Sequence, residues 1–203
     1  MPKQAKHHAE ASEIRPRIIR AALVLIENEG FSAVTAPRLA TEIGLRRTVI
    51  YYYFQDIDQV LIEAVMLAYQ ESKDEAISSI RTRDAKEVLW DFFSNAAAPL
   101  SELIALAIRN ERFRAIYTSI IADFRSHIVT AIQHQNAARH AEPELDPESL
   151  ALLIQIVSSA IATERRLGLS AGHSGLKDYI EAKFIRDHSL NSQTRVPRGR
   201  PKV

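Results

Sequence analysis

Between residues 35 and 54 the sequence contains two short amphipathic patterns that meet at a glycine. Thr35 can cap the first helix with its hydroxyl, and Pro37 stands in the first turn, where a missing backbone N–H is harmless. Gly44 follows the last apolar residue of that pattern and tolerates the left-handed backbone that a sharp turn needs. The segment therefore predicts two helices set across one another, which is a helix-turn-helix.

The second helix of this hairpin is rich in groups that can contact nucleic acid. We expect Val49, Ile50 and Phe54 to face inward. The remaining side chains offer guanidinium groups for guanine edges or phosphates, and hydroxyls for phosphates. The alternative is an ordinary helical hairpin with half-buried tyrosines and solvated arginines. The predicted DNA-binding residues are Thr35, Arg38, Arg46, Arg47, Thr48, Tyr51, Tyr52 and Tyr53.

The sequence on both sides of the hairpin favours the DNA-binding interpretation. An amphipathic pattern occupies residues 18–31, and Asp56 can cap a helix that follows. Residues 14–65 resemble the N-terminal domain of the TetR family of bacterial repressors. The matching residues, in order and at the family's spacing, are Ala21-Ala22, Gly30-Phe31, Thr35, Leu39-Ala40, Gly44, Ile50-Tyr51, Tyr53-Phe54 and Leu61.

Three positions depart from the pattern of that family. Arg46 stands where a small hydroxyl residue is usual, Tyr53 where a histidine is common, and Ile57 where the family has a lysine that contacts the DNA backbone. The exchange at Ile57 removes one expected phosphate contact, for which Arg46 can supply a replacement. The operator sequence therefore cannot be transferred from relatives.

The composition predicts an all-α fold, and the family resemblance implies two domains. Of 203 residues, 46% are apolar; glycine and proline are sparse, and apolar residues recur every three or four positions. The predicted divisions are a flexible basic N-terminal tail (1–13), a three-helix helix-turn-helix domain (14–56), an effector-binding and dimerisation domain (57–187), and a disordered basic C-terminal tail (188–203).

Local signals also predict the later helices. Asp56 should start a helix that runs toward Ser79, and the segment 84–87 should start another. Pro99 is expected to mark a break before a helix at 100–108. Helices are expected at 112–138, at 147–167 with Asp146 as cap, and at about 174–187.

Several classes of protein are disfavoured by what the sequence lacks. No segment reaches the roughly 18 consecutive apolar residues of a membrane span, and the N-terminus has no apolar signal segment, so we expect a cytoplasmic protein without a membrane partner. The absence of cysteine excludes disulfides and thiolate metal sites. The net charge of +1 is uninformative as a sum, but Arg15, Arg17 and Arg20 lie near the hairpin, either as a solvated flank or as phosphate contacts.

The family resemblance implies a homodimer that binds double-stranded DNA. Two recognition helices about 34–36 Å apart would read a palindrome. The expected interface lies on the last two helices, where small or uncharged residues form a second stripe; packing inside a single bundle is the alternative. The predicted interface residues are Gln155, Ser158, Ser159, Ala162, Leu176, Tyr179, Ile180 and Phe184.

The resemblance also implies a pocket for a small-molecule effector in the middle helices, whose identity the sequence does not give. The apolar character of the candidates favours a lipophilic or aromatic compound, although aromatic residues at helical spacing are also typical of a core. The candidate lining residues are Trp90, Phe93, Ile104, Ile108, Arg109, Asn110, Phe113, Tyr117 and Ile121, with Asn95 as a further polar group.

The sequence contains few of the motifs expected for metal binding or catalysis. His127 and His134 lie on one helix face, but metal spacing such as His-x-x-x-His, a glycine-rich phosphate loop and a Gly-x-Ser-x-Gly motif are all absent. We therefore expect no catalytic residue, no metal and no cofactor. A metal-sensing repressor, a helical enzyme and an architectural DNA-binding protein without effector remain the alternatives to a repressor.

The C-terminal tail contains Pro197-Arg-Gly-Arg-Pro201, which resembles the core of an AT-hook. Arg198 and Arg200 could enter a narrow A·T-rich minor groove, with Gly199 allowing close backbone approach. The alternative is a basic tail that only aids solubility.

Overall fold

The computed structural model describes residues 2–95, 97–139 and 144–185, and among these the chain is helical and without strands. The all-α prediction is therefore confirmed. The elements are α1 (Pro2–Glu29), η1 (Phe31–Ala33), α2 (Ala36–Ile43), α3 (Arg47–Tyr53), α4 (Ile57–Ser79), α5 (Ala85–Asn95), α6 (Ala97–Arg109), α7 (Glu111–Arg139), α8 (Pro147–Arg166), α9 (His173–Ile180) and a π-helical turn η2 (Glu181–Ile185).

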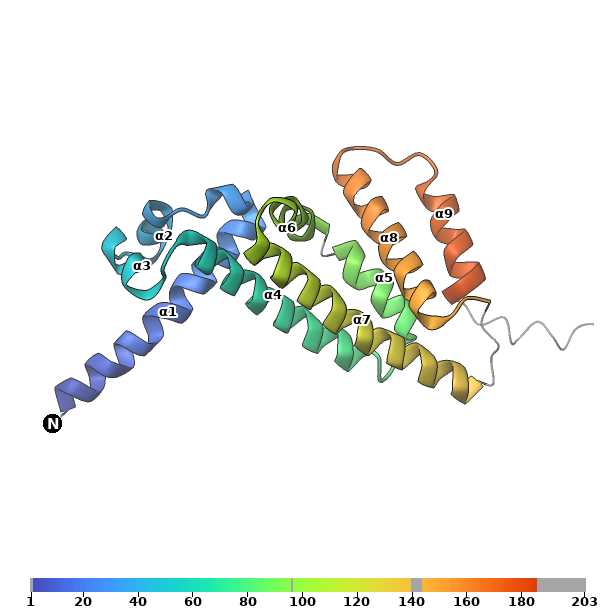
Figure 1. Ribbon diagram of the computed structural model, residues 1–203, viewed down its shortest axis with the longest axis horizontal. Coiled ribbons are helices and arrows are strands. Elements are labelled where there is room, and N and C mark those ends of the chain that lie inside the picture. The colour runs from blue at the N-terminus through green and yellow to red at the C-terminus, as the bar shows by residue number, and fades with distance from the viewer. Residues whose placement is uncertain (1, 96, 140–143, 186–203) are drawn as a thin grey trace, which may run out of the picture.

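The described part of the molecule is elongated. Figure 1 shows α2 and α3 beside α1 at one end, and α8 and α9 at the other. The helices α4 and α7 run along the middle and pack on each other. The helices α4 and α7 therefore connect the two ends of the described part of the chain.

Side-chain and backbone caps set the helix ends where the sequence predicts them. Thr35 Oγ1 accepts a hydrogen bond from the Arg38 N–H at 3.4 Å, and Gly44 ends α2 in the left-handed region, with φ 69° and ψ 33°. Asp56 Oδ1 accepts from the Gln59 N–H at 2.7 Å and starts α4. Asp146 caps α8 in the same way, through the N–H of Ser149 at 2.9 Å. Local polar groups and Gly44 thus set the ends of α2 and the starts of α4 and α8.

Two predicted boundaries are wrong. The helix α1 begins at Pro2, although a flexible tail was expected as far as residue 13; the segment before Glu13 contains three alanines and two lysines, which favour helix. Pro99 does not break the chain, because it lies in the first turn of α6, where no intrahelical partner is lost.

Two hydrophobic clusters form the interior, and neither is confined to one half of the sequence. The N-terminal cluster contains Ile18, Leu39 and Ile50 together with Val60 of α4, and it extends to Leu103 of α6 and Phe113 of α7. The second cluster joins α4, α5, α7 and α8, where the rings of Phe92 and Phe124 stack with centroids 3.9 Å apart. Because α4, α6 and α7 contribute to both clusters, the helix-turn-helix packs firmly against the rest of the chain.

Candidate DNA interface and effector pocket

Helix α3 buries one face and leaves the other open to solvent. Ile50 is 0% exposed and Phe54, at the C-cap, is also buried, whereas Tyr52 is 82% exposed. Arg46, Arg47, Thr48 and Tyr51 are exposed as well, and the Arg47 guanidinium lies 5.6 Å from the centroid of the Tyr51 ring. The structure therefore gathers five of the predicted DNA-binding side chains on one short surface of α3 and its N-cap.

The other three predicted DNA-binding residues have structural roles. Thr35 caps α2, as described above. Arg38 forms exposed ion pairs with Glu29 at 2.9 Å and with Glu42 at 3.0 Å, within the chain. Tyr53 is half-buried and packs edge-on against Tyr52, with ring centroids 5.0 Å apart. It is not on the outer face, because the N-terminal cluster covers it.

The arginines of α1 are held by intramolecular contacts. Arg15 pairs with Glu63 of α4 and lies over the Phe54 ring, 5.0 Å from its centroid. Arg20 pairs with Glu71 of α4 at 3.0 Å. Arg17 donates to the Ile43 carbonyl at 3.0 Å. These contacts fasten α1 to α4 and to the end of α2, which is a role the sequence alone did not reveal.

A second set of polar contacts joins α6 and α7 to the DNA-binding end. Glu102 Oε2 accepts a hydrogen bond from the Phe31 N–H at 2.8 Å. Asn110 donates to Asp58 at 3.0 Å, and Arg112 donates to Asp56 Oδ2 at 2.7 Å. Hydrogen bonding from Arg112 lowers the pKa of Asp56, the residue that caps α4. Sequence reasoning missed these contacts because more than 50 residues separate the partners along the chain.

A pocket of about 500 Å³ lies between α1, α4, α5, α6 and α7. Its wall is mainly apolar and includes Ile26 of α1, Leu103 of α6 and Ile121 of α7. Tyr69 of α4 also lines it, and the hydroxyl of this residue is engaged as a donor to Asp123 at 2.7 Å. A volume of this size is within the range of sites for small organic molecules.

Most of the residues predicted to line an effector pocket lie elsewhere. Ile121 does line the pocket, as does the polar candidate Asn95. Phe93 and Phe113 are fully buried in the two clusters, and Tyr117 is half-buried and packs against both. Ile104, Ile108 and Arg109 are exposed, Asn110 binds Asp58, and Trp90 lines a separate, smaller pocket between α5 and α9.

Most of the predicted dimer stripe on α8 lies inside the protomer. Ser158 is 0% exposed, and its hydroxyl donates to the Ile154 carbonyl at 2.7 Å; Gln155 and Ala162 are buried too, while Ser159 is half-buried. The reason is that α8 packs on both α5 and α7, so it buries two faces within the protomer. On the final helix Ile180 is buried and Phe184 is half-buried, whereas Leu176 and Tyr179 are exposed.

The structure also shows where the two candidate metal-binding histidines lie. His127 Nδ1 lies 2.8 Å from the Asp123 carbonyl oxygen, and His134 is exposed. The described residues contain no group of three histidine, aspartate or glutamate side chains arranged to hold a metal ion. Within the same residues, none of the helices is both long and apolar enough to cross a membrane. The tail residues Arg198, Gly199 and Arg200 lie outside the described part of the chain.

Comparisons with known proteins agree with this architecture. Residues 18–64 match the family model of bacterial regulatory proteins of the tetR family. No curated protein matches the chain in sequence. A TetR family regulator from Cytophaga hutchinsonii has a TM-score of 0.71 and 19% identity, over 85% of this chain and 94% of that chain.

Two further solved structures contain ligands. A protein from Saccharomonospora viridis in complex with choline has a TM-score of 0.68 and 20% identity, over 84% of this chain and 96% of that one. The regulator FadR from Bacillus subtilis, in complex with stearoyl-CoA, has a TM-score of 0.61 and 17% identity, over 84% of this chain and 98% of that one. At these identities the likeness establishes a shared fold.

A helix-turn-helix with an exposed, basic and tyrosine-rich second helix, packed on a larger helical region, defines a DNA-binding regulator. Residues 18–64 thus match the DNA-binding region of the tetR family of bacterial regulatory proteins, and the chain shares the fold of TetR family transcriptional regulators. Proteins of this family are transcription regulators rather than enzymes.

Proposed function

We propose that this protein represses transcription by binding a palindromic operator as a homodimer, and that a small molecule releases it. The observation that carries the proposal is the exposed set Arg46, Arg47, Thr48, Tyr51 and Tyr52 on α3 and its N-cap. Two guanidinium groups and three hydroxyls on one short helix are suited to base edges and phosphates in a major groove.

Dimerisation through α8 and α9 is supported by the apolar side chains that these helices expose. Leu152 is 41% exposed and Ile156, one turn later on α8, is 56% exposed. Leu176 and Tyr179 on α9 are exposed as well, at the same end of the molecule. Solvent-exposed apolar residues at helical spacing on neighbouring elements are typical of a protein interface. We therefore assign the interface to this outer face instead of the stripe through Ser158.

We assign effector binding to the 500 Å³ pocket. Its lining comes from α1 as well as from α4 to α7, so a ligand there would contact both the DNA-binding helices and the larger helical region. Solved structures with this fold contain choline or stearoyl-CoA, which supports a small-molecule effector in general terms. We accordingly divide the chain into a DNA-binding unit at residues 14–56 and an effector-binding and dimerisation unit at residues 57–187.

Release from DNA follows if the ligand binds one arrangement of the two recognition helices better than the other. A ligand shifts such an equilibrium only by its differential affinity for the two states. Helix α4 begins directly after α3 and lines the pocket through Val65, Tyr69 and Ala76, so it is the direct connection between the two sites. A small rotation of α4 would change the spacing of the two recognition helices.

The proposal is tested by selecting bound sequences from random duplex DNA with the full-length protein. We expect a palindrome whose half-sites are centred about one helical turn, or a multiple of it, apart. Recovery of unrelated sequences, with no enrichment over the input pool, would overturn the proposal. A single enriched half-site bound by a monomer would overturn the dimeric part alone.

A further inference from the structure

The rim of the large pocket has acidic side chains from two different parts of the chain. Glu27 of α1 and Glu75 of α4 both line the pocket and are exposed. No ion pair among the described residues includes either carboxylate. The two negative charges are therefore available to a bound molecule.

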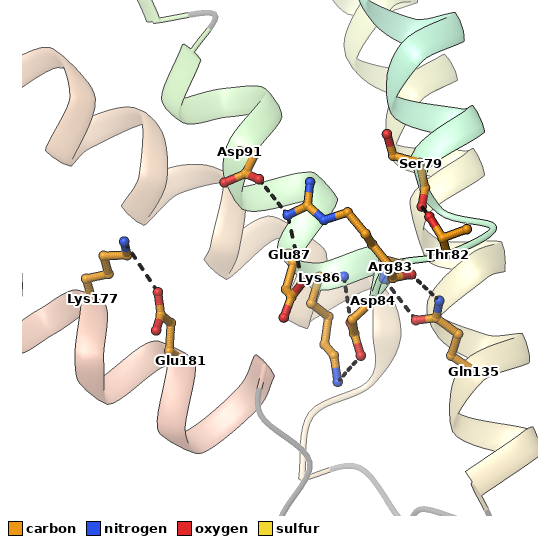
Figure 2. A network of polar contacts seen from close by, with 11 residues as sticks. Ser79, Thr82, Arg83, Asp84, Lys86, Glu87, Asp91, Gln135, Lys177 and Glu181 are labelled. Carbon is orange, nitrogen blue, oxygen red and sulfur yellow. Dashed lines mark hydrogen bonds and ion pairs between the residues drawn. The ribbon is translucent and has the colours of Figure 1, made fainter.

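The basic residue of the described lining is already neutralised. Arg83 donates to Asp91 Oδ2 at 2.6 Å and lies 3.8 Å from Glu87 Oε2, as Figure 2 shows. The hydrogen bond to Asp91 raises the pKa of the Arg83 guanidinium and so stabilises its charged form. Since Asp91 and Arg83 cancel each other, Glu27 and Glu75 leave the pocket with a net negative charge.

The interior of the pocket is apolar, in contrast to its acidic rim. Ile26, Leu103, Ile120 and Ile121 are all buried apolar residues on the wall, and the hydroxyl of Tyr69 is committed to Asp123. An apolar ligand body would gain from leaving water against this surface. A carboxylate or phosphate ligand would have to approach two uncompensated carboxylates, which is unfavourable.

We propose that the pocket binds a lipophilic cation, whose positive charge lies near Glu27 and Glu75 while its apolar body covers the inner wall. This inference rests on the effector-binding part of the proposed function and gives it a chemical class. It also gives α1 a direct part in sensing. Glu27 lies in the last turn of α1, three residues before Gly30, so a cation held by Glu27 and Glu75 would draw the C-terminal end of α1 toward α4.

The test compares two probes of matched shape and opposite charge, tetraphenylphosphonium and tetraphenylborate, by equilibrium dialysis against the full-length protein without DNA. The wild-type protein should bind the cation at least about tenfold more tightly than the anion, the difference expected from one favourable charge pair in a partly solvated site. Equal binding, or tighter binding of tetraphenylborate, would overturn the proposal.

A double variant, Glu27→Gln with Glu75→Gln, tests whether these two carboxylates cause the preference for the cation. We expect about a tenfold loss of tetraphenylphosphonium affinity and no loss for tetraphenylborate. Asp74→Asn is the matched control, because it removes an exposed carboxylate next to Glu75 on α4 that accepts a hydrogen bond from Gln70 of the same helix and does not line the pocket. A double variant that keeps the wild-type affinity, or a control that loses it equally, would overturn the assignment. Circular dichroism checks that the exposed substitutions leave the fold intact.

The two proposals fail in different ways. If the protein binds its selected operator but shows no preference for the cation, the ligand class is wrong and the regulatory function stands. If no operator can be selected while tetraphenylphosphonium binds through Glu27 and Glu75, the pocket assignment stands and the regulatory function is wrong. Where both hold, saturating tetraphenylphosphonium should weaken operator binding by the wild-type protein and have less effect on the double variant.

Discussion

The carboxylate of Glu102 accepts a hydrogen bond from the backbone N–H of Phe31 at 2.8 Å, joining α6 to the turn that follows α1. Gly30, immediately before, has a φ of +86°, and a Cβ there would lie 2.9 Å from Glu102 Oε1. The positive φ favours glycine at this position, whereas the close approach involves the end of the flexible Glu102 side chain. The contact fixes the helix-turn-helix end of the chain against a helix of the 500 Å³ pocket, since Leu103 next to Glu102 lines that pocket.

Replacing Glu102 by alanine should loosen this connection. The Phe31 N–H would lose its acceptor, so the free energy of unfolding should fall by about 1–2 kcal/mol. Glu102→Gln is the control, because its amide carbonyl can still accept the bond. Urea denaturation of both variants measures the difference. If alanine and glutamine have the same effect, the hydrogen bond is not what stabilises the contact.

The ion pair between Asp56 and Arg112 predicts a dependence of stability on pH. Hydrogen bonds from Arg112 and from the Gln59 N–H hold the pKa of Asp56 below its ordinary value. A carboxylate with a lowered pKa in the folded state stabilises the fold above its unfolded pKa of about 4, and this contribution is lost as pH falls through the lower folded value.

The variant Asp56→Asn isolates that contribution. Asparagine still caps α4, because its side-chain oxygen can accept from the Gln59 N–H, but it has no charge to titrate. Thermal unfolding between pH 2 and pH 7 should show the wild-type advantage over the variant shrinking below about pH 4. An advantage that does not change with pH would show that the charge of Asp56 contributes nothing to stability.

Two nearby residues on α8 distinguish the proposed dimer interface from the protomer core. Ile156 is 56% exposed, so Ile156→Glu should yield monomers with nearly unchanged protomer stability. Ser158 is fully buried, so Ser158→Glu should instead destabilise the protomer itself, by about 3 kcal/mol or more. Sedimentation and urea denaturation distinguish the two effects. A dimer that survives Ile156→Glu would place the interface on another face.

Local sequence signals were sufficient for the helix-turn-helix. Thr35, Gly44, Asp56 and Asp146 each act on backbone groups within a few residues, so their effect can be predicted without knowing the tertiary structure. The burial of Ile50 and the exposure of Tyr52 follow from helical periodicity alone. This is why the outer face of α3 was largely predicted correctly.

The pocket and the dimer face could not be predicted in the same way. The stripe through Ser158 is small and uncharged, which suits a partner subunit and a neighbouring helix equally, and only the packing of α8 between α5 and α7 decides between them. The pocket includes Glu27 and Ile26 because α1 lies beside α4, an arrangement set by contacts such as Arg20 with Glu71. Periodicity identifies a buried face of a helix, but it does not identify the neighbour that covers it.

The most direct test of the account is to measure how tightly the variants Arg47→Ala and Tyr52→Ala bind the selected operator, compared with the wild-type protein. Arg165→Ala, at an exposed position near the C-terminal end of α8, is the control. Each α3 variant should lose about 1–3 kcal/mol of operator binding if its side chain contacts a base, with helicity and dimerisation unchanged. The control should bind as the wild-type protein does. Unchanged operator affinity in both α3 variants would contradict the assignment of α3 as the recognition helix.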